Sequence, residues 1–421
     1  MNILLINNYY PPEIGAASHL YYYLAKKLIN RGHNVYVLTG IPRYNIEKKI
    51  YLSYKNQNRK KIIIENSSEG VKVLRVKLPY VERRQLLRRG LEHFEIAFKL
   101  FFYSKKSLLS NPIDVSLVYS PPLTLYWTAS RIRKMLGTPF VLNVQDLFPQ
   151  AAIDLGVIKN PLLIRFFKQL EKKAYKESDL ITVHSENNKK YIEKIADKPE
   201  KVLVVENWID EDEIKPGNKG NEFAKKYGLV DKFVVSFAGT LGFSQDMEVI
   251  VRAANLLKNM KDIMFIIVGD GVRLEETKRL IKELQLKNIL LIPPVPREKY
   301  PLVLNSSDLS LATLTKDVKT PVVPSKILSI MSAGIPVIAS MNLEGDAPKL
   351  IENANAGYVV PPGDFRSLAE KIMILYKNPE LRKALGRNGR NYIENNLSAS
   401  YAAKIYEEIF EKLIKNRKAR R

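Results

Sequence analysis

Residues 323–364 constrain the fold more than any other stretch. The Pro-Ser pair at 324–325 can open a helix that Gly334 can end, and the apolar run at 335–340 is typical of a strand buried in a parallel sheet. A helix N-terminus offers unpaired N–H groups and a partial positive charge, to which Lys326 adds a full charge. This unit predicts an α/β fold with an anion site suited to a diphosphate.

Strand and helix patterns alternate in two successive series. Residues 3–7, 16–30 and 35–39 predict a strand-helix-strand unit, and a new series begins at residue 233. A chain of 421 residues also exceeds what one core usually supports. We therefore expect two Rossmann-like domains that face each other across a cleft. Their expected limits are 1–206 for the first domain, 207–232 for a linker, 233–392 for the second domain, and 393–421 for a C-terminal helix that returns toward the first domain and ends in a basic tail.

Composition narrows the chemistry. The chain has no cysteine, which excludes disulfides, thiolate metal sites and a cysteine nucleophile, and its four histidines are scattered. Lys and Arg outnumber Asp and Glu by 67 to 44, so the formal charge of +23 predicts attraction to phosphates, anionic lipid or nucleic acid. The N-terminus lacks the features of a signal peptide and no apolar run could span a bilayer, so we expect a cytoplasmic protein.

Polar residues follow the strands of the first domain, where open α/β sheets place their ligands. Glu13 and Gly15 lie in the first loop; Gly15 either lets backbone approach a ligand or is a turn glycine. His19 follows on the next helix, where a lone histidine is more often structural. Gln145 and Asp146 follow the strand at 140–144 and are site candidates, although Asp146 could instead cap the next helix.

Residues 44–69 are polar and basic and predict a loop, whereas residues 80–110 predict a basic amphipathic helix. Its apolar side chains recur at spacings of three and four: Leu87, Leu91, Phe94, Phe98 and Phe101. Its basic side chains are Arg83, Arg84, Arg88, Arg89, Lys99, Lys105 and Lys106. Such a helix suits an anionic membrane surface or a lipid-linked substrate. The alternative, an ordinary core-facing helix with a solvated basic face, stays open.

The second domain opens with a strand and a glycine loop at 239–242, which could cradle phosphate through backbone N–H groups. A second strand ends at Gly269 and Asp270. The pair Asp210 and Asp212 could hold a divalent ion, but it lies in the expected linker, so we do not assign a metal site.

Several short motifs together resemble family 4 of the retaining glycosyltransferases, which have the GT-B fold. They are PEIG, QDLFPQAAIDLG, VVENWID, FAGTLG followed by Gln245 and Asp246, VGDG, VPSK with SAGIPVIA, and GYVVPPGD. The resemblance covers nearly the whole chain, and the order of the motifs is more specific than any one of them. The residues within these motifs are most similar to those of bacterial and archaeal aminosugar transferases of O-antigen or capsule assembly.

The resemblance implies a nucleotide-sugar donor, UDP-linked and carrying an N-acetylated aminosugar, and a lipid-linked glycan acceptor at the inner face of the cell membrane. Fixed positive groups would stabilise the leaving diphosphate, so neither a metal nor a cofactor is implied. The implied catalytic residues are Lys326, Asp146 and Gln145. The implied donor-binding residues are Gly239, Thr240, Gly242, Gly269, Asp270, Arg273, Pro324, Ser325, Lys326, Ser329 and Asp346, with Lys319 as a helper. The implied acceptor-binding residues are Glu13, Gly15, His19, Arg83, Arg84 and Arg88.

The chain departs from the family in three places. Many members carry Glu-x7-Glu, where this chain has Pro321 and Ser329. Many have an Arg in the glycine loop and a Lys shortly after it, where this chain has Thr240 and the region of Gln245. Many have His before Asp at the fourth strand end, where this chain has Gln145, so a catalytic histidine is excluded there.

Two alternatives to a transferase remain. A sugar-nucleotide epimerase shares the two-domain fold but would need several carboxylates and histidines in its cleft, and histidine is scarce here. The second, a nucleic-acid-binding protein, is suggested by charge alone. Because of the three departures, a non-catalytic relative of the transferases also stays open. No helix-turn-helix, zinc module or aromatic RNA-binding motif accompanies that charge, so we expect no nucleic-acid partner.

Overall fold

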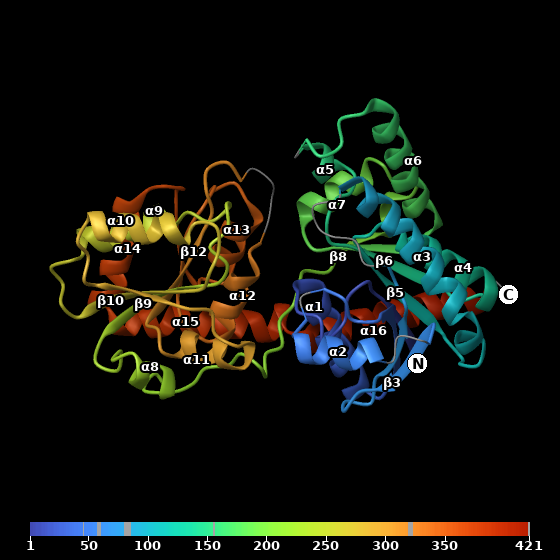
Figure 1. Cartoon of the computed structure of the whole chain (residues 1–421), viewed down its shortest axis with the longest axis horizontal. Helices are drawn as coiled ribbons and strands as arrows, with labels where there is room; N and C mark the ends of the chain where they lie inside the picture. The colour runs from blue at the N-terminus through green and yellow to red at the C-terminus, as the bar shows by residue number, and fades with distance from the viewer. Residues whose placement is uncertain (45, 57–59, 80–85, 155, 319–322, 420–421) are drawn as a thin grey trace. The chain divides into compact units, whose positions relative to one another are not determined.

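The computed structural model describes residues 1–421 apart from 45, 57–59, 80–85, 155, 319–322 and 420–421. The chain forms two compact units, one of residues 1–207 with 399–421 and one of residues 208–398 (Figure 1). Among the described residues, no helix is long and apolar enough to cross a membrane.

The first unit is built on an eight-stranded sheet in the order β3-β4-β2-β1-β5-β6-β7-β8. Every neighbouring pair is parallel except β3 with β4. The strands are β1 (Asn2–Ile6), β2 (Asn34–Gly40), β3 (Ile62–Asn66), β4 (Lys72–Val76), β5 (Val115–Ser120), β6 (Phe140–Val144), β7 (Leu180–Val183) and β8 (Val202–Val204). The β5 and β6 side chains are buried throughout, as expected of central parallel strands covered on both faces.

Helices cover this sheet. They are α1 (Ala16–Asn30), α2 (Lys48–Asn56), α3 (Leu86–Leu109), α4 (Leu125–Leu136), α5 (Gln150–Asp154), α6 (Pro161–Glu177), α7 (Glu186–Glu193), a 3₁₀ turn (Pro199–Lys201) and α16 (Ala399–Ala419). The C-terminal α16 packs on α1. Its buried Tyr406 hydroxyl lies 3.1 Å from both Asn143 Nδ2 and Thr182 Oγ1, so the last helix is part of the core of the first unit.

The predicted loop at residues 44–69 was wrong in part. The structure places α2 and β3 there, and β3 pairs antiparallel with β4, with Ile62 opposite Val76. The strand contains three consecutive isoleucines, but the residues before it are rich in lysine and asparagine, and as an edge strand it has only one partner strand.

Helix α3 carries apolar side chains on two faces, one buried and one exposed. The prediction had placed residues from both faces on a single apolar stripe. Ile96, Leu100 and Leu108 pack into the core, and Phe101 joins them. The other stripe members do not share that face: Leu91 and Phe98 are exposed, and Phe94 is half-buried. The helix thus faces the core, as the alternative expected, but through a face that holds only Phe101 of the predicted stripe. The side chain of Leu87 lies outside the described residues.

The second unit has a six-stranded, wholly parallel sheet in the order β11-β10-β9-β12-β13-β14. Its strands are β9 (Phe233–Ala238), β10 (Ile263–Val268), β11 (Ile289–Ile292), β12 (Leu309–Thr313), β13 (Val337–Ser340) and β14 (Gly357–Val360). Its helices are α8 (Glu222–Lys226), α9 (Met247–Leu256), α10 (Leu274–Glu283), a 3₁₀ turn (Arg297–Lys299), α11 (Tyr300–Asn305), α12 (Ser325–Ser332), α13 (Asp346–Asn353), α14 (Phe365–Lys377), α15 (Pro379–Tyr392) and a π-helical turn (Ile393–Leu397). Two sheets that are parallel apart from the β3–β4 pair, each covered by helices, confirm the predicted α/β fold class.

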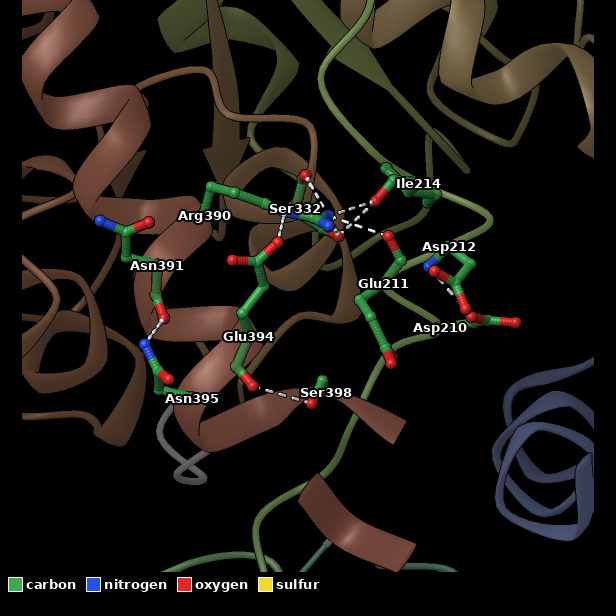
Figure 2. Close-up of polar contacts among 10 residues, drawn as sticks. All are labelled: Asp210, Glu211, Asp212, Ile214, Ser332, Arg390, Asn391, Glu394, Asn395 and Ser398. Atoms are coloured by element: carbon green, nitrogen blue, oxygen red, sulfur yellow. Dashed lines mark hydrogen bonds and ion pairs between the residues drawn. The ribbon is translucent and has the colours of Figure 1, made fainter. Parts of the chain in front are cut away.

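The predicted linker at 207–232 is not a free connection, because residues 208–232 belong to the second unit. Figure 2 shows how Arg390 of α15 holds this segment: its Nη1 lies 2.9 Å from the carbonyl oxygen of Glu211 and 3.0 Å from those of Ile214 and Ser332. Arg390 Nε also donates to Glu394 at 2.7 Å. The guanidinium thus joins the main chain at Glu211 and Ile214 to that of Ser332 on α12.

Candidate active site

Two glycine loops meet at the carboxyl ends of β9 and β10. Leu241 N donates to Asp270 O at 2.9 Å, and Arg273 N donates to Leu241 O at 3.1 Å. A Cβ on Gly269 would overlap the carbonyl oxygen of Gly239, and its φ of +154° is one that other residues rarely adopt. Only glycine therefore permits this approach of the two loops, which sets the main chain of residues 239–242 at the sheet edge.

Lys326 projects from the first turn of α12 toward the loop after β9. Its Nζ donates to Gln245 Oε1 at 2.7 Å and lies 3.8 Å from the centre of the buried Phe237 ring. A Cβ on Gly239 would lie 3.5 Å from the same nitrogen. The structure thus brings together the glycine loop and the Pro-Ser-Lys motif, which are far apart in the sequence.

Burial lowers the pKa of Lys326 to about 7. The ring face and the Gln245 oxygen both favour the charged ammonium, but neither carries a negative charge that would compensate its desolvation. An anion placed at this lysine would supply that charge.

The remaining predicted donor residues line the same two loops or the start of α12. Thr240 and Asp270 are exposed, and Asp270 Oδ1 accepts from Gly271 N at 2.7 Å. Arg273 donates to the carbonyl oxygen of Phe243 at 3.3 Å, so its guanidinium lies beside the glycine loop. Pro324 precedes α12 and Ser325 is exposed on its first turn. Gly242 is partly exposed, and the helper Lys319 and the family position Pro321 lie outside the described residues.

Ser329 lies within α12 and Asp346 lies at the start of α13. The Ser329 hydroxyl is buried and donates to Ser325 O of its own helix at 3.3 Å. Asp346 is the first residue of α13, where its carboxylate is favourable to the helix dipole. Asp246, next to Gln245, caps α9 by accepting from Val249 N at 3.0 Å. Of these two neighbours, Gln245 contacts Lys326, whereas Asp246 caps α9.

A groove of about 540 Å³ lies on the second unit between α9 and α10. Asp246 and Arg273 are among its lining residues, but Gly239 and Lys326 are not. The groove is lined by carboxylates and cations together, and it shares Arg273 with the loop site.

In the first unit, Gln145 and Asp146 have different surroundings. Gln145 is buried and donates to Asn143 Oδ1 at 3.0 Å, toward the Tyr406 network. Asp146 is exposed as a residue, yet partial burial of its carboxyl raises its pKa, and the nearby His184 opposes that shift. The cap alternative for Asp146 was wrong, because α5 begins only at Gln150.

Glu13 connects two loops at the carboxyl ends of β1 and β2. Its Oε1 accepts from Arg43 N and Tyr44 N, each at 3.0 Å, and burial raises its pKa while Arg43 opposes the shift. Arg43 in turn donates to Asn8 Oδ1 at 2.5 Å, and its guanidinium lies 5.4 Å from the Tyr9 and Tyr44 ring centres. Arg43 was not among the predicted site residues. Its position just after the end of β2, where such sheets place ligands, could have indicated it.

Gly15 precedes α1 in an extended conformation, and a Cβ there would meet no atom within 4 Å. His19 lies on the first turn of α1 with its ring stacked on Tyr23, 6.1 Å between centres. Arg88 is exposed on α3, while Arg83 and Arg84 lie outside the described residues.

The described residues contain no group of three or more His, Cys, Asp or Glu side chains that could hold a metal ion. The pair Asp210 and Asp212 forms a local turn instead, in which Asp210 Oδ1 accepts from Asp212 N at 3.1 Å. Asp210 is buried in that turn.

Two family models match consecutive parts of the chain. Residues 15–213 match glycosyltransferase family 4, and residues 220–392 match glycosyl transferases group 1. Together with the two parallel-sheet units, these matches define a GT-B glycosyltransferase. The chain belongs to family 4 of the glycosyltransferases and is an enzyme that transfers sugar. The epimerase and nucleic-acid alternatives are not supported by these matches.

The chain is similar to several proteins named as glycosyltransferases or related synthases. It is 28% identical to a probable glycosyltransferase, WbjE of Pseudomonas aeruginosa, over 70% of this chain and 74% of the relative. It is 22% identical to N-acetyl-alpha-D-glucosaminyl L-malate synthase of Bacillus anthracis over 97% of this chain and 96% of that one. Among solved structures, Anabaena HepE in complex with UDP has a TM-score of 0.67 at 16% identity and covers 98% of this chain and 100% of its own. That structural likeness confirms the fold.

Proposed function

We propose that this enzyme transfers a sugar, with retention of configuration, from a UDP-sugar to a lipid-linked glycan acceptor in surface polysaccharide synthesis. The observation that carries the donor part is the meeting of Lys326 with the glycine loop at Gly239. An ammonium beside main-chain N–H groups and a helix N-terminus is suited to a diphosphate.

In this proposal the bond between the sugar C1 and the diphosphate oxygen breaks as an acceptor hydroxyl forms its bond to C1 on the same face. The hydroxyl proton passes to an oxygen of the leaving phosphate. Lys326 and the N–H groups of the α12 first turn stabilise the charge that develops on the diphosphate, which is the part of the reaction most in need of electrostatic help. Arg273 is a second candidate contact from the adjoining loop.

The names of relatives support the proposed donor, the transferred sugar and the acceptor. HepE is described in complex with UDP and with UDP-glucose, which favours a UDP-linked donor. Aminosugar transfer is named for an alpha-D-kanosaminyltransferase of Streptomyces kanamyceticus and for a phosphatidylinositol N-acetylglucosaminyltransferase subunit of Saccharomyces cerevisiae, the second of which acts on a lipid. A putative colanic acid transferase of Escherichia coli, WcaI, favours surface polysaccharide.

On the acceptor side we propose Glu13, Gly15, His19, Asp146 and Arg88, with the protein peripheral at the inner face of the cell membrane. Asp146 is exposed at a strand end with a raised pKa, as expected of a carboxylate available to a hydroxyl group. Gln145 and Glu13 act in this proposal by fixing the loops, since their own side chains are bonded within the first unit.

A thermal-shift panel of the purified protein against UDP, GDP, ADP and UDP-sugars, with and without EDTA, tests the donor assignment. We expect UDP or one UDP-sugar to raise the melting temperature selectively, and EDTA to leave that rise unchanged. Equal shifts for all three nucleoside diphosphates would contradict the UDP assignment, and loss of the shift in EDTA would contradict metal-independent binding.

A further inference from the structure

One face of the first unit exposes large apolar side chains on two helices. Leu91 and Phe102 of α3 are 72% and 60% exposed, and Leu162 and Phe166 of α6 are 77% and 49% exposed. Isolated exposed apolar residues are ordinary, but a contiguous group indicates an interaction surface.

Ring contacts join the two helices into one surface. The Phe94 ring of α3 lies 6.1 Å from the Phe166 ring of α6. On α3, the Phe98 ring lies 4.3 Å from Trp127 of α4 and 6.4 Å from Phe102. We name this surface the aromatic face; its members are Leu91, Phe94, Phe98, Phe102, Trp127, Leu162, Leu163 and Phe166. Figure 1 shows α3, α4 and α6 in the first unit.

The aromatic face is opposite the core contacts of α3. Residues 98 and 102 follow one another at helical spacing, and each is two positions, or about 200°, from the core residues Leu100 and Ser104. Burying this second stripe therefore needs a partner outside the helix's own core. On α6, Asn160 accepts from Leu162 N and Leu163 N, which fixes the first helical turn that exposes both leucines.

Cations surround these apolar side chains. Lys105 and Lys106 are exposed on α3, and Arg165 and Lys168 are exposed on α6. The guanidinium of Arg131, also exposed, lies 5.0 Å from the Trp127 ring centre. Aromatic and leucine side chains among basic ones match the interface of an anionic bilayer, in which apolar groups enter the acyl boundary and cations meet phosphate.

We propose that the aromatic face is a docking surface for an anionic lipid bilayer, formed by α3 and α6 together. A second copy of this chain is a poorer occupant, because a two-fold interface would bring the same cations against each other on a chain of net charge +23. The proposal deepens the proposed function, which places the acceptor on a lipid, but the surface is argued from exposure and charge alone.

Vesicle flotation tests the proposal with no acceptor or nucleotide present, so it does not depend on transferase activity. Vesicles of phosphatidylcholine with phosphatidylglycerol are compared with phosphatidylcholine alone. We expect the full chain to bind the anionic vesicles and to be released by 0.5 M salt. A Phe102→Ser, Phe166→Ser variant should lower partitioning at least about tenfold, since each ring removes a large apolar area. A Lys105→Glu, Arg165→Glu variant should do the same.

Matched controls lie on the second unit, where Leu256 and Leu381 are exposed leucines and Lys258 and Lys282 are exposed lysines. Leu256→Ser with Leu381→Ser, and Lys258→Glu with Lys282→Glu, should bind vesicles as the parent does. For every variant, the melting temperature without ligand reports folding, and the rise in melting temperature with UDP reports the donor site. Equal binding by the aromatic-face and control variants would overturn the proposal. So would a parent dimer that Phe102→Ser, Phe166→Ser converts to monomer, because a second copy would then occupy the face.

Discussion

The ammonium of Lys326 is held by a neutral amide, 2.7 Å from Gln245 Oε1, across a sequence separation of 81 residues. A carboxylate at position 245 would cancel the charge of the lysine, whereas the amide orients it and leaves that charge available. Gln245 lies in the loop between β9 and α9, and Lys326 lies in the first turn of α12. Their contact therefore fixes the distance between that loop and the start of α12. This relationship underlies the first three predictions.

Replacing Lys326 by Met should weaken UDP binding about 10–100-fold, because one charge-assisted hydrogen bond to phosphate is lost. Isothermal titration calorimetry measures this directly. The variant should fold, since Met fills the space of the aliphatic stem over Phe237 without a charge to desolvate. Lys349→Ala, at an exposed lysine on α13, is the matched control and should bind UDP as the parent does. Parent-like binding by Lys326→Met would remove this lysine from the donor site.

UDP affinity should fall as the pH rises above about 7, the pKa to which burial lowers Lys326. A bound diphosphate raises that pKa, so the complex holds more protons than the free protein, and affinity falls by up to about tenfold per pH unit. Titrations between pH 6.5 and 9 measure the slope, and buffers of different ionisation enthalpy reveal the proton taken up. Lys326→Arg stays charged and should show a flat profile. The same slope in both proteins would assign the titration to another group.

Gln245→Glu should weaken UDP binding about tenfold while raising the pKa of Lys326, because the new carboxylate pairs with the ammonium and competes with phosphate. The pH dependence of binding between 7 and 9 should flatten at the same time. Gln245→Met, which removes the hydrogen bond without adding charge, should instead keep the pH slope. Tighter UDP binding by Gln245→Glu would show that the amide does not serve to preserve the charge of Lys326.

The alternation of buried strands and helices could be predicted from sequence because parallel strands such as β5 and β6 are continuously apolar, which is a strong local signal. The edge strand β3 has only a short signal, the three isoleucines at 62–64, of which Ile63 alone is buried, since one neighbouring strand and one covered face suffice for it. The stripe on α3 was merged with the core face because helical spacing of three and four cannot say which of two apolar faces is covered.

Only those residues of the candidate site that lie in recognisable sequence motifs could be predicted. Lys326 and the glycine loop follow from local helix-start and strand-end patterns, but their contact through Gln245 depends on the sheet order that places β9 beside β12. Arg43 depends still more on distant partners, because Asn8 and Glu13 reach it from another strand end. No spacing rule within the sequence encodes such contacts.

Gly15→Ala should leave folding intact but lower sugar transfer at least about tenfold. A Cβ at this position meets no protein atom within 4 Å, and the extended backbone accepts any residue, so stability should change by less than about 1 kcal/mol. Only a ligand close to the backbone would meet the added methyl group. Transfer kinetics alongside the melting temperature separate the two effects, and full activity would favour the alternative that Gly15 serves only the turn.

Glu171 of α6 supplies a prediction about stability. Burial raises the pKa of its carboxyl to about 7, and the Tyr175 hydroxyl, which donates to it at 3.0 Å, only partly opposes that shift. Between the ordinary carboxyl pKa and 7 the folded state holds more protons than the unfolded state, so its stability falls as the pH rises through this window. Above pH 7 the buried carboxylate is charged and its full cost is present.

Glu171→Gln keeps an oxygen for the Tyr175 hydroxyl but cannot ionise, so it should stabilise the first unit by about 1–3 kcal/mol at pH 8 and by much less at pH 5. Differential scanning calorimetry at the two pH values measures the difference, with each unit's transition followed separately. Glu200→Gln, at an exposed glutamate of the same unit, should shift neither transition at either pH. A gain at pH 5 equal to that at pH 8 would mean that ionisation of Glu171 is not its cause.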